Sequence, residues 1–170
     1  SISVSKIFVN TNLAACGGVM ANALITRLLY GKTDVVHMLN GAIAGLVAIT
    51  AEPLTSSPFV AILIGGGGGF IAVFGPQLLY NFKFDDVVGA IPVHLFDGIW
   101  GTLAVPITNS KVAFSSQLIG IISINVFVFI VSFIVWYFMK KTIGIRLSAK
   151  AEKIGTDKSE VGVVAYAIRD

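Results

Sequence analysis

Five long apolar stretches, separated by short polar segments, constrain this chain more than any other feature. Each is near or above the length of about 17–25 residues that a tilted helix needs to cross a bilayer. Backbone groups in lipid are satisfied only in helices or closed barrels, and none of the stretches has the alternation of a barrel strand. We therefore predict an all-α membrane protein with five transmembrane helices, at residues 7–30, 35–51, 59–80, 87–107 and 114–139, followed by a cytosolic tail at residues 140–170.

The composition argues against a soluble domain and against several kinds of chemistry. Charged residues make up only 12% of the chain, about half of their usual share in soluble domains. A single cysteine, Cys16, excludes a disulfide framework, and two histidines leave little material for a metal site. The basic residues are not gathered into a nucleic-acid-binding patch. Without a nucleophile–base pair or a nucleotide loop, we predict no enzyme, no cofactor, no bound metal and no nucleic-acid partner.

Lysine and arginine predict the orientation in the membrane, because they favour the cytoplasmic side. Five spans place the two ends of the chain on opposite sides. One side carries only Lys6 and Lys111. The other side carries the remaining basic residues, which are Arg27, Lys32, Lys83, Lys140, Lys141, Arg146, Lys150, Lys153, Lys158 and Arg169. We therefore expect a multi-pass protein of the cell (inner) membrane, with this chain's N-terminus outside and its tail in the cytoplasm.

The start of the chain does not look like a signal peptide. Residues 1–10 have no basic start, no short apolar core and no cleavage site. The chain also does not begin with methionine. We therefore expect it to be a fragment, a processed product or an incomplete chain.

Small residues inside the apolar stretches predict close helix packing. Gly41 and Gly45 are four residues apart and share one helix face, which permits close backbone approach in lipid. The five consecutive glycines 65–69 could suggest a phosphate-binding loop, but no Lys-Ser/Thr pair follows them and apolar residues flank them. Tight helix packing is the better explanation for this run.

The fourth stretch contains the residue with the clearest functional interest. His94 lies eight residues beyond Asp86, or about 12 Å along a helix, which places it near the middle of the bilayer. Ionisable groups at this depth are costly and usually face a pore or a buried partner. A neutral imidazole can accept one hydrogen bond, donate another and pass on a proton. The alternative is a core histidine bonded to a backbone carbonyl.

Three further polar or aromatic residues of this stretch are candidates for supporting roles. Asp97 follows His94 by three residues, so we expect it to pair with the histidine or to line an outer cavity. Asp86 precedes the apolar run and is expected to cap the helix start, while Pro92 interrupts the helix near His94. Trp100 is a supporting residue or possible ligand. The other histidine, His37, begins the second stretch beside an aspartate, and we expect a structural role for it.

Three segments resemble the second half of ammonium transporters of the Amt/Mep/Rh family. They are Asn-Thr-Asn at residues 10–12, the string Asn-Gly-Ala-Ile-Ala-Gly-Leu-Val-Ala-Ile-Thr at residues 40–50, and residues 85–101 around His94. Tail residues 144–148, 155–157, 159–162 and 165–166 also resemble the family's cytosolic region. The resemblance covers nearly the whole chain, and the second string is highly specific.

The resemblance implies an eleven-helix fold in which these five spans are the seventh to the eleventh. It also implies a homotrimer with one pore in each subunit. The family's pore carries two adjacent histidines in a narrow apolar channel, and His94 matches the second. The first histidine, a substrate-binding aspartate and an aromatic outer gate belong mostly to the first half of the fold. His37 does not match the first histidine.

The chain departs from the family pattern in two places. Leu95 and Asp97 stand where the family usually has glycines, so we expect Leu95 to crowd a close helix approach and Asp97 to hold ammonium more tightly. In the tail, Val161 and Val163 replace a histidine and a glutamate. This replacement weakens the case for the family's tail-mediated coupling between subunits and for regulation by a PII signalling protein.

Three functions remain open at this point. The first is conduction, in which ammonium loses its proton outside and crosses as ammonia beside a relay through the twin histidines. The second is an ammonium sensor coupled to a cytosolic signalling domain. The third is a half-pore that completes a complex with another polypeptide, since transporters often combine two repeats.

Overall fold

The computed structural model describes residues 2–165, which belong to two compact units. The first unit ends at Ser123 and the second begins at Ile124. Ser1 and residues 166–170 lie outside the described residues. These residues include Tyr166, which belongs to the family-like tail segment, and Arg169, which is one of the basic residues predicted on the cytoplasmic side.

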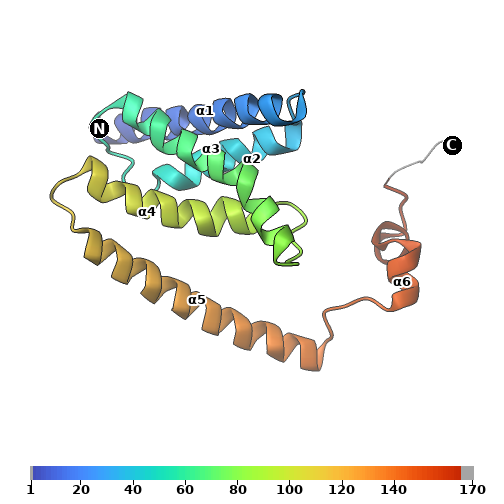
Figure 1. Cartoon of the computed structure of the whole chain (residues 1–170). Helices are drawn as coiled ribbons and strands as arrows, with labels where there is room; N and C mark the ends of the chain where they lie inside the picture. Colours follow the sequence, from blue (N-terminus) through green and yellow to red (C-terminus); the bar gives the residue numbers. More distant parts are fainter. Residues whose placement is uncertain (1, 166–170) are drawn as a thin grey trace. The chain divides into compact units, whose positions relative to one another are not determined.

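The first unit is a helix bundle without strands in its described residues. Its helices are α1 (Ile2–Tyr30), α2 (Val35–Ile49), α3 (Pro58–Asn81), the π-helical segment η1 (Ile91–Phe96) and α4 (Asp97–Thr108), followed by the start of α5 (Phe114–Thr142). The first three helices all pack against one another, and η1 and α4 pack against α2 and α3 (Figure 1). The predicted all-α fold is confirmed.

Helix lengths follow the apolar pattern, with differences at the ends. By length and composition, α1, α3 and α5 are long enough and apolar enough to cross a membrane, while α2 is a shorter apolar helix. Helix α1 starts five residues before the predicted span, and α5 continues three residues beyond it. The fourth helical run starts at Ala90, where the prediction had 87, because the turn through Gly89 has a φ of +77°. Positive φ favours glycine and interrupts a right-handed helix.

Glycines bring the backbones of α1, α2 and α3 into direct contact. A Cβ added at Gly18 would meet the carbonyl oxygen of Gly41, and a Cβ at Gly45 or Gly65 would meet the carbonyl oxygen of Ala14. A Cβ at Gly69 would meet the backbone of Gly18. Glycines 65–69 are therefore helical and pack against other helices, which leaves no phosphate loop. With a Cβ atom at these positions, the helices could not approach so closely.

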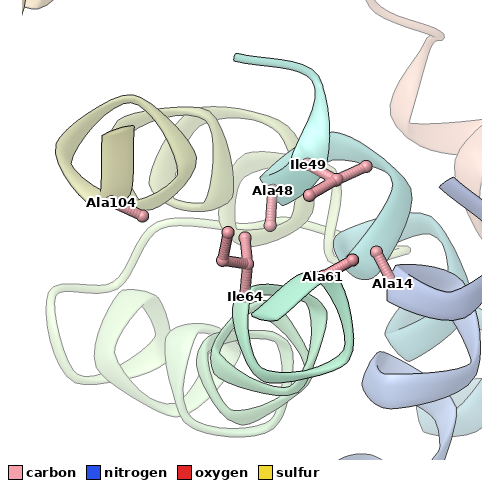
Figure 2. Close-up of a cluster of buried hydrophobic side chains, with 6 residues drawn as sticks. All are labelled: Ala14, Ala48, Ile49, Ala61, Ile64 and Ala104. Carbon is pink, nitrogen blue, oxygen red and sulfur yellow. The ribbon is translucent and has the colours of Figure 1, made fainter. Parts of the chain in front are cut away.

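A cluster of small side chains fills the space where α1, α2, α3 and α4 converge. Figure 2 shows its six buried members, which are Ala14, Ala48, Ile49, Ala61, Ile64 and Ala104. Four of the six are alanines, so most of the packing involves methyl groups close to the backbone. Dispersion contacts at such short range contribute much of the association energy when lipid surrounds the bundle.

Buried asparagines add specific polar contacts to this apolar bundle. The Nδ2 atom of Asn10 donates to the carbonyl oxygens of Pro53, at 2.9 Å, and Thr55, at 3.4 Å. The Nδ2 atom of Asn22 donates to the carbonyl oxygen of Gly69 at 2.7 Å. These bonds attach α1 to the loop before α3 and to the centre of α3, which fixes the register of the helices.

The second unit contains the end of α5 and the described part of the tail. It includes α6 (Ala149–Ile154), capped by the side chain of Ser148, and the π-helical turn η2 (Asp157–Val161). Arg146 and Glu152 form an exposed ion pair at 3.0 Å. The carboxylate of Asp157 accepts the backbone N–H of Ala165 at 2.9 Å, and this bond is the main cause that lowers the pKa of Asp157.

Candidate functional site

The candidate site is built on the start of the fourth helical run, where η1 carries His94. The carboxylate of Asp86 accepts the backbone N–H groups of Ala90, at 2.9 Å, and Ile91, at 2.8 Å. Both donors lie in the first helical turn, where backbone N–H groups have no partner within the helix. Asp86 thus stabilises the helix start, and it lies about two turns from the histidine.

Pro92 lies in the first turn of this helical run, where its missing backbone N–H costs no helical bond, and the carbonyl of Val88 belongs to the turn before the run. The side chain of Asn40 donates to that carbonyl at 2.8 Å. A Cβ added at Gly89 would lie only 3.0 Å from the same Asn40 Nδ2. A residue from α2 therefore holds the turn that leads into the helical run.

One face of η1 packs against the bundle. Val93 is buried in a small cluster with Ala44 and Ala72. A Cβ added at Gly75 would lie 2.5 Å from the ring of Pro92 and 3.3 Å from that of Phe96. Gly75 in α3 therefore leaves the space into which η1 fits. This contact determines which side of η1 points away from the bundle.

His94 lies on the opposite side of η1 and is exposed on the surface of the first unit. Its imidazole makes no hydrogen bond within the described part of the chain, so neither ring nitrogen is committed to a structural partner. Its exposed neighbours Ile91 and Leu95 are apolar. Leu95 is 40% exposed and crowds no helix among the described residues, so the expectation that it crowds a close helix approach stays a prediction.

Asp97 differs from both expectations made for it. Its side chain has 0% exposure, and neither carboxylate oxygen has a hydrogen-bond partner among the described residues. It therefore neither pairs with His94 nor lines an outer cavity. The reason is geometric, because Asp97 follows Val93 by one turn and precedes Gly101 by one turn. Val93 and Gly101 both face the bundle, where a Cβ at Gly101 would meet the carbonyl oxygen of Ala48.

Trp100 joins α4 to α3. Its indole Nε1 donates to the carbonyl oxygen of Ile64 at 3.0 Å, and its ring lies over Gly67, where a Cβ would be 2.7 Å from the indole. The ring also lines an open groove of about 480 Å³ between the two helices. The groove is bounded by Ser56, Val60, Leu63, Ala104, Ile107 and Thr108. Since the indole N–H is already bonded, the tryptophan offers only its ring face to a ligand.

Two further ionisable residues of the first unit, Glu52 and Asp34, make side-chain contacts at the ends of helices. Glu52 accepts the hydroxyl of Thr108 at 2.5 Å and the side-chain amide of Asn109 at 3.0 Å, which ties the end of α2 to the end of α4. Asp34 caps α2 by accepting the backbone N–H of His37, and this bond is the main cause that lowers the pKa of Asp34. His37 Nδ1 lies 3.1 Å from the same carboxylate. Among the described residues, no group of three His, Cys, Asp or Glu side chains could hold a metal ion.

Comparison with known proteins places this arrangement in a family. Residues 1–166 match the Ammonium Transporter Family. The chain belongs to that family. The resemblance seen around His94 and at residues 40–50 is therefore confirmed, and the members of the family are transporters and not enzymes.

Individual ammonium transporters match the chain along nearly its full length. The ammonium transporter Amt2 of Archaeoglobus fulgidus is 41% identical over 97% of this chain and 40% of its own length. A putative ammonium transporter of Synechocystis, sll1017, is 39% identical over 92% of this chain and 36% of its own length. The chain thus spans about two fifths of the curated ammonium transporters that it matches.

Solved structures of the ammonium transporter family share the fold. A structure named Sensor Amt Protein superposes with a TM-score of 0.84 at 26% identity, covering 94% of this chain and 42% of its own. Mep2 of Candida albicans superposes with a TM-score of 0.79 at 23% identity, covering 88% of this chain and 38% of its own. The second likeness supports the fold alone.

Sequence reasoning missed two residues of the site. Asn40 bonds the carbonyl of Val88 before the fourth helical run, and Glu52 joins two helix ends. Nothing in the sequence indicates that Asn40 bonds a carbonyl 48 residues away. Glu52 has the same limitation, because its partners lie 56 and 57 residues further along the chain.

Proposed function

We propose that the complete protein conducts ammonium or ammonia across the cell (inner) membrane through an apolar pore lined by His94. The observation that carries the proposal is an exposed histidine without hydrogen bonds, flanked by apolar side chains, in a chain of the ammonium transporter family. Since the chain spans about two fifths of its relatives, the rest of the pore belongs to residues outside it.

The proposed mechanism separates the proton from ammonia. Transfer of a charged ion from water into an apolar pore costs a large free energy, whereas transfer of neutral ammonia does not. Ammonium releases its proton at the outer end, ammonia crosses, and a histidine pair that includes His94 carries the proton. An imidazole with two uncommitted nitrogens is suited to accept a proton on one side and release one on the other.

The test is ammonium-evoked current through the protein in lipid vesicles. Replacing His94 with Ala removes the proton acceptor, and we expect the proton-coupled current to fall about a hundredfold or more, as for other positioned acid–base groups. The matched control is His37→Ala, which removes the other histidine, at the start of α2, and is expected to keep the current. Unchanged proton-coupled current in the His94 variant excludes the relay role.

A second candidate is an ammonium sensor, which the likeness to the Sensor Amt Protein favours. In this case the protein binds ammonium through the same fold but passes little of it, and the tail continues toward a cytosolic signalling domain. Calorimetric binding of ammonium without current in vesicles would support the sensor. Peptide mapping of the protein from native membranes would then reveal the signalling domain.

We further propose the assembly and topology that the resemblance and the charge pattern support. The protein is a homotrimer, with this chain's N-terminus outside and residues 140–170 in the cytoplasm. Native mass spectrometry tests the trimer, and cysteine labelling from either side of sealed vesicles tests the topology. A monomer, or labelling of the tail from outside, contradicts these assignments.

The cytosolic tail is the proposed contact for a PII-type regulator. Val161 and Val163 are exposed in the described part of the tail, where they would present apolar rather than ionisable side chains to such a partner. A binding measurement between a purified PII protein and the transporter in vesicles tests the contact. Binding that Val161→Asp leaves unchanged would place the contact elsewhere.

A further inference from the structure

The carboxyl group of Asp97 is buried within the first unit without a polar partner. Its side chain has 0% exposure, and neither oxygen accepts a hydrogen bond from a described residue. Burial of an ionised carboxylate without a compensating partner is strongly unfavourable, even after the protein relaxes. The structure must therefore either neutralise this charge or avoid it.

No basic side chain is available to neutralise Asp97. The segments η1 and α4 pack against α2 and α3, and neither of these helices contains Lys or Arg. Their ionisable side chains are His37, which lies beside Asp34 at the start of α2, and Tyr80, which is 78% exposed near the end of α3. His94, on η1 itself, is exposed and makes no ion pair with Asp97. An ion pair is therefore absent from the described surroundings of the carboxyl group.

The surfaces next to Asp97 offer hydrogen-bond acceptors rather than donors. One turn before it, Val93 contacts Ala44 and Ala72, and one turn after it, Gly101 faces the carbonyl oxygen of Ala48. Alanine side chains carry no donor, and N–H groups inside a helix are bonded within that helix. Carbonyl oxygens repel a carboxylate, but they accept a hydrogen bond from a carboxylic acid.

The packing also leaves no room for a bound molecule. Because the exposure of the side chain is 0%, a sphere of the size of a water molecule cannot touch it. Ammonium is about as large as water, so it is excluded in the same way. A proton is the partner that needs no additional space.

We propose that Asp97 is a neutral, protonated carboxylic acid, a proton-binding site inside the helix bundle that is separate from His94 and donates its O–H to a backbone carbonyl. The assignment does not depend on whether the protein transports or senses ammonium. It replaces the expectation that Asp97 holds ammonium, because the group lies on the packed side of the helix and His94 lies on the other side.

Infrared spectroscopy of the protein in lipid vesicles at neutral pH tests the proposal. The wild type is expected to show the C=O stretching band of a protonated carboxylic acid, and Asp97→Asn is expected to lose it. The matched control is Asp86→Asn, which removes a carboxylate that accepts two backbone N–H groups and is expected to keep the band. Absence of the band in the wild type, or its persistence in Asp97→Asn, overturns the proposal.

Isotope labelling provides a test that does not depend on the folding of a variant. Wild-type protein that carries ¹³C in its aspartate side-chain carboxyl groups is expected to show the acid band at lower wavenumber. The band is also expected to exchange slowly in D₂O, because water does not reach the group. A band that does not shift, or one that exchanges at once, shows that the protonated acid is not Asp97.

Discussion

Helices α3 and α5 are both long and apolar, yet their compositions differ sharply. Helix α3 has glycines at 65–69 and at Gly75, and several of them are buried against the backbones of neighbouring helices. Helix α5 has Gly120 alone and consists largely of phenylalanine, isoleucine and valine. Lipid is as apolar as leucine, so hydrophobicity alone does not drive two helices together in a membrane. Small residues therefore mark a helix packed inside a bundle, whereas large apolar residues suit a helix that faces lipid.

The largest expected effect comes from a charge in the centre of α5. Replacing Val128 with Lys places an ammonium group near the bilayer centre, which costs about 2.5–3.5 kcal/mol in membrane insertion. Insertion of the isolated helix, measured by a glycosylation assay, is expected to fall accordingly. The control Val128→Leu keeps an apolar side chain and is expected to insert like the wild type. Equal insertion of both variants would contradict a transmembrane position for α5.

A methyl group added to α3 and to α5 is expected to act in opposite directions. Gly65→Ala forces a Cβ against the backbone of Ala14, and overpacking of this kind costs about 1–3 kcal/mol. Gly120→Ala meets nothing within 4 Å, so it is expected to be neutral or to stabilise the helix by up to about 1 kcal/mol. Thermal unfolding in detergent compares the two variants. Equal loss of stability in both would remove the distinction between the helices.

The polar bond between α1 and α3 is expected to matter less than the glycine contacts. Asn22→Ala removes the hydrogen bond to the carbonyl of Gly69, with an expected loss of about 1 kcal/mol. Asn12 provides the control, because its exposed side chain bonds only the carbonyl of Phe8 in its own helix. Asn12→Ala is expected to change the same unfolding free energy by less than about 0.5 kcal/mol. A larger loss from Asn12→Ala would show that the bond between the helices is not the important one.

The smallest effect is expected at the start of α2 and depends on pH. The bond from His37 N–H favours ionised Asp34 in the folded state and lowers its pKa below 3.8. Its contribution to the stability of the helix start is therefore full above pH 3.8 and is lost as the pH falls through the lowered value. The protection of the His37 amide against hydrogen exchange, corrected for the intrinsic pH dependence of exchange, is expected to fall on this acidification. Asp34→Asn keeps a capping side chain and is expected to remove the dependence.

The helical architecture could be predicted from two local properties of the sequence. The length of each apolar stretch reflects the thickness of the membrane, and small residues mark the faces on which helices pack. The pair Gly41 and Gly45 and the glycines 65–69 lie in helix contacts, as their spacing indicates. Helix packing could be predicted for glycines 65–69 because the Lys-Ser/Thr pair of a phosphate loop does not follow them. These features depend on local sequence, so a single chain is enough to interpret them.

The environment of Asp97 could not be predicted in the same way. Its position three residues after His94 suggests a neighbouring helix face, and an ideal α-helix would allow contact between the two. The π-helical turns of η1 change how successive residues are placed around the axis, which moves the two side chains to different sides. The position of this change depends on Pro92 and on the space left by Gly75, which only the folded structure combines.

The bond from Asn40 to Val88 has a mechanical consequence. Val88 lies in the turn that precedes the fourth helical run, and Asn40 lies on α2. A displacement of this turn away from α2 must therefore stretch or break the 2.8 Å bond between them. A tilt of α2 would accordingly pull on the turn that leads into the segment that carries the histidine.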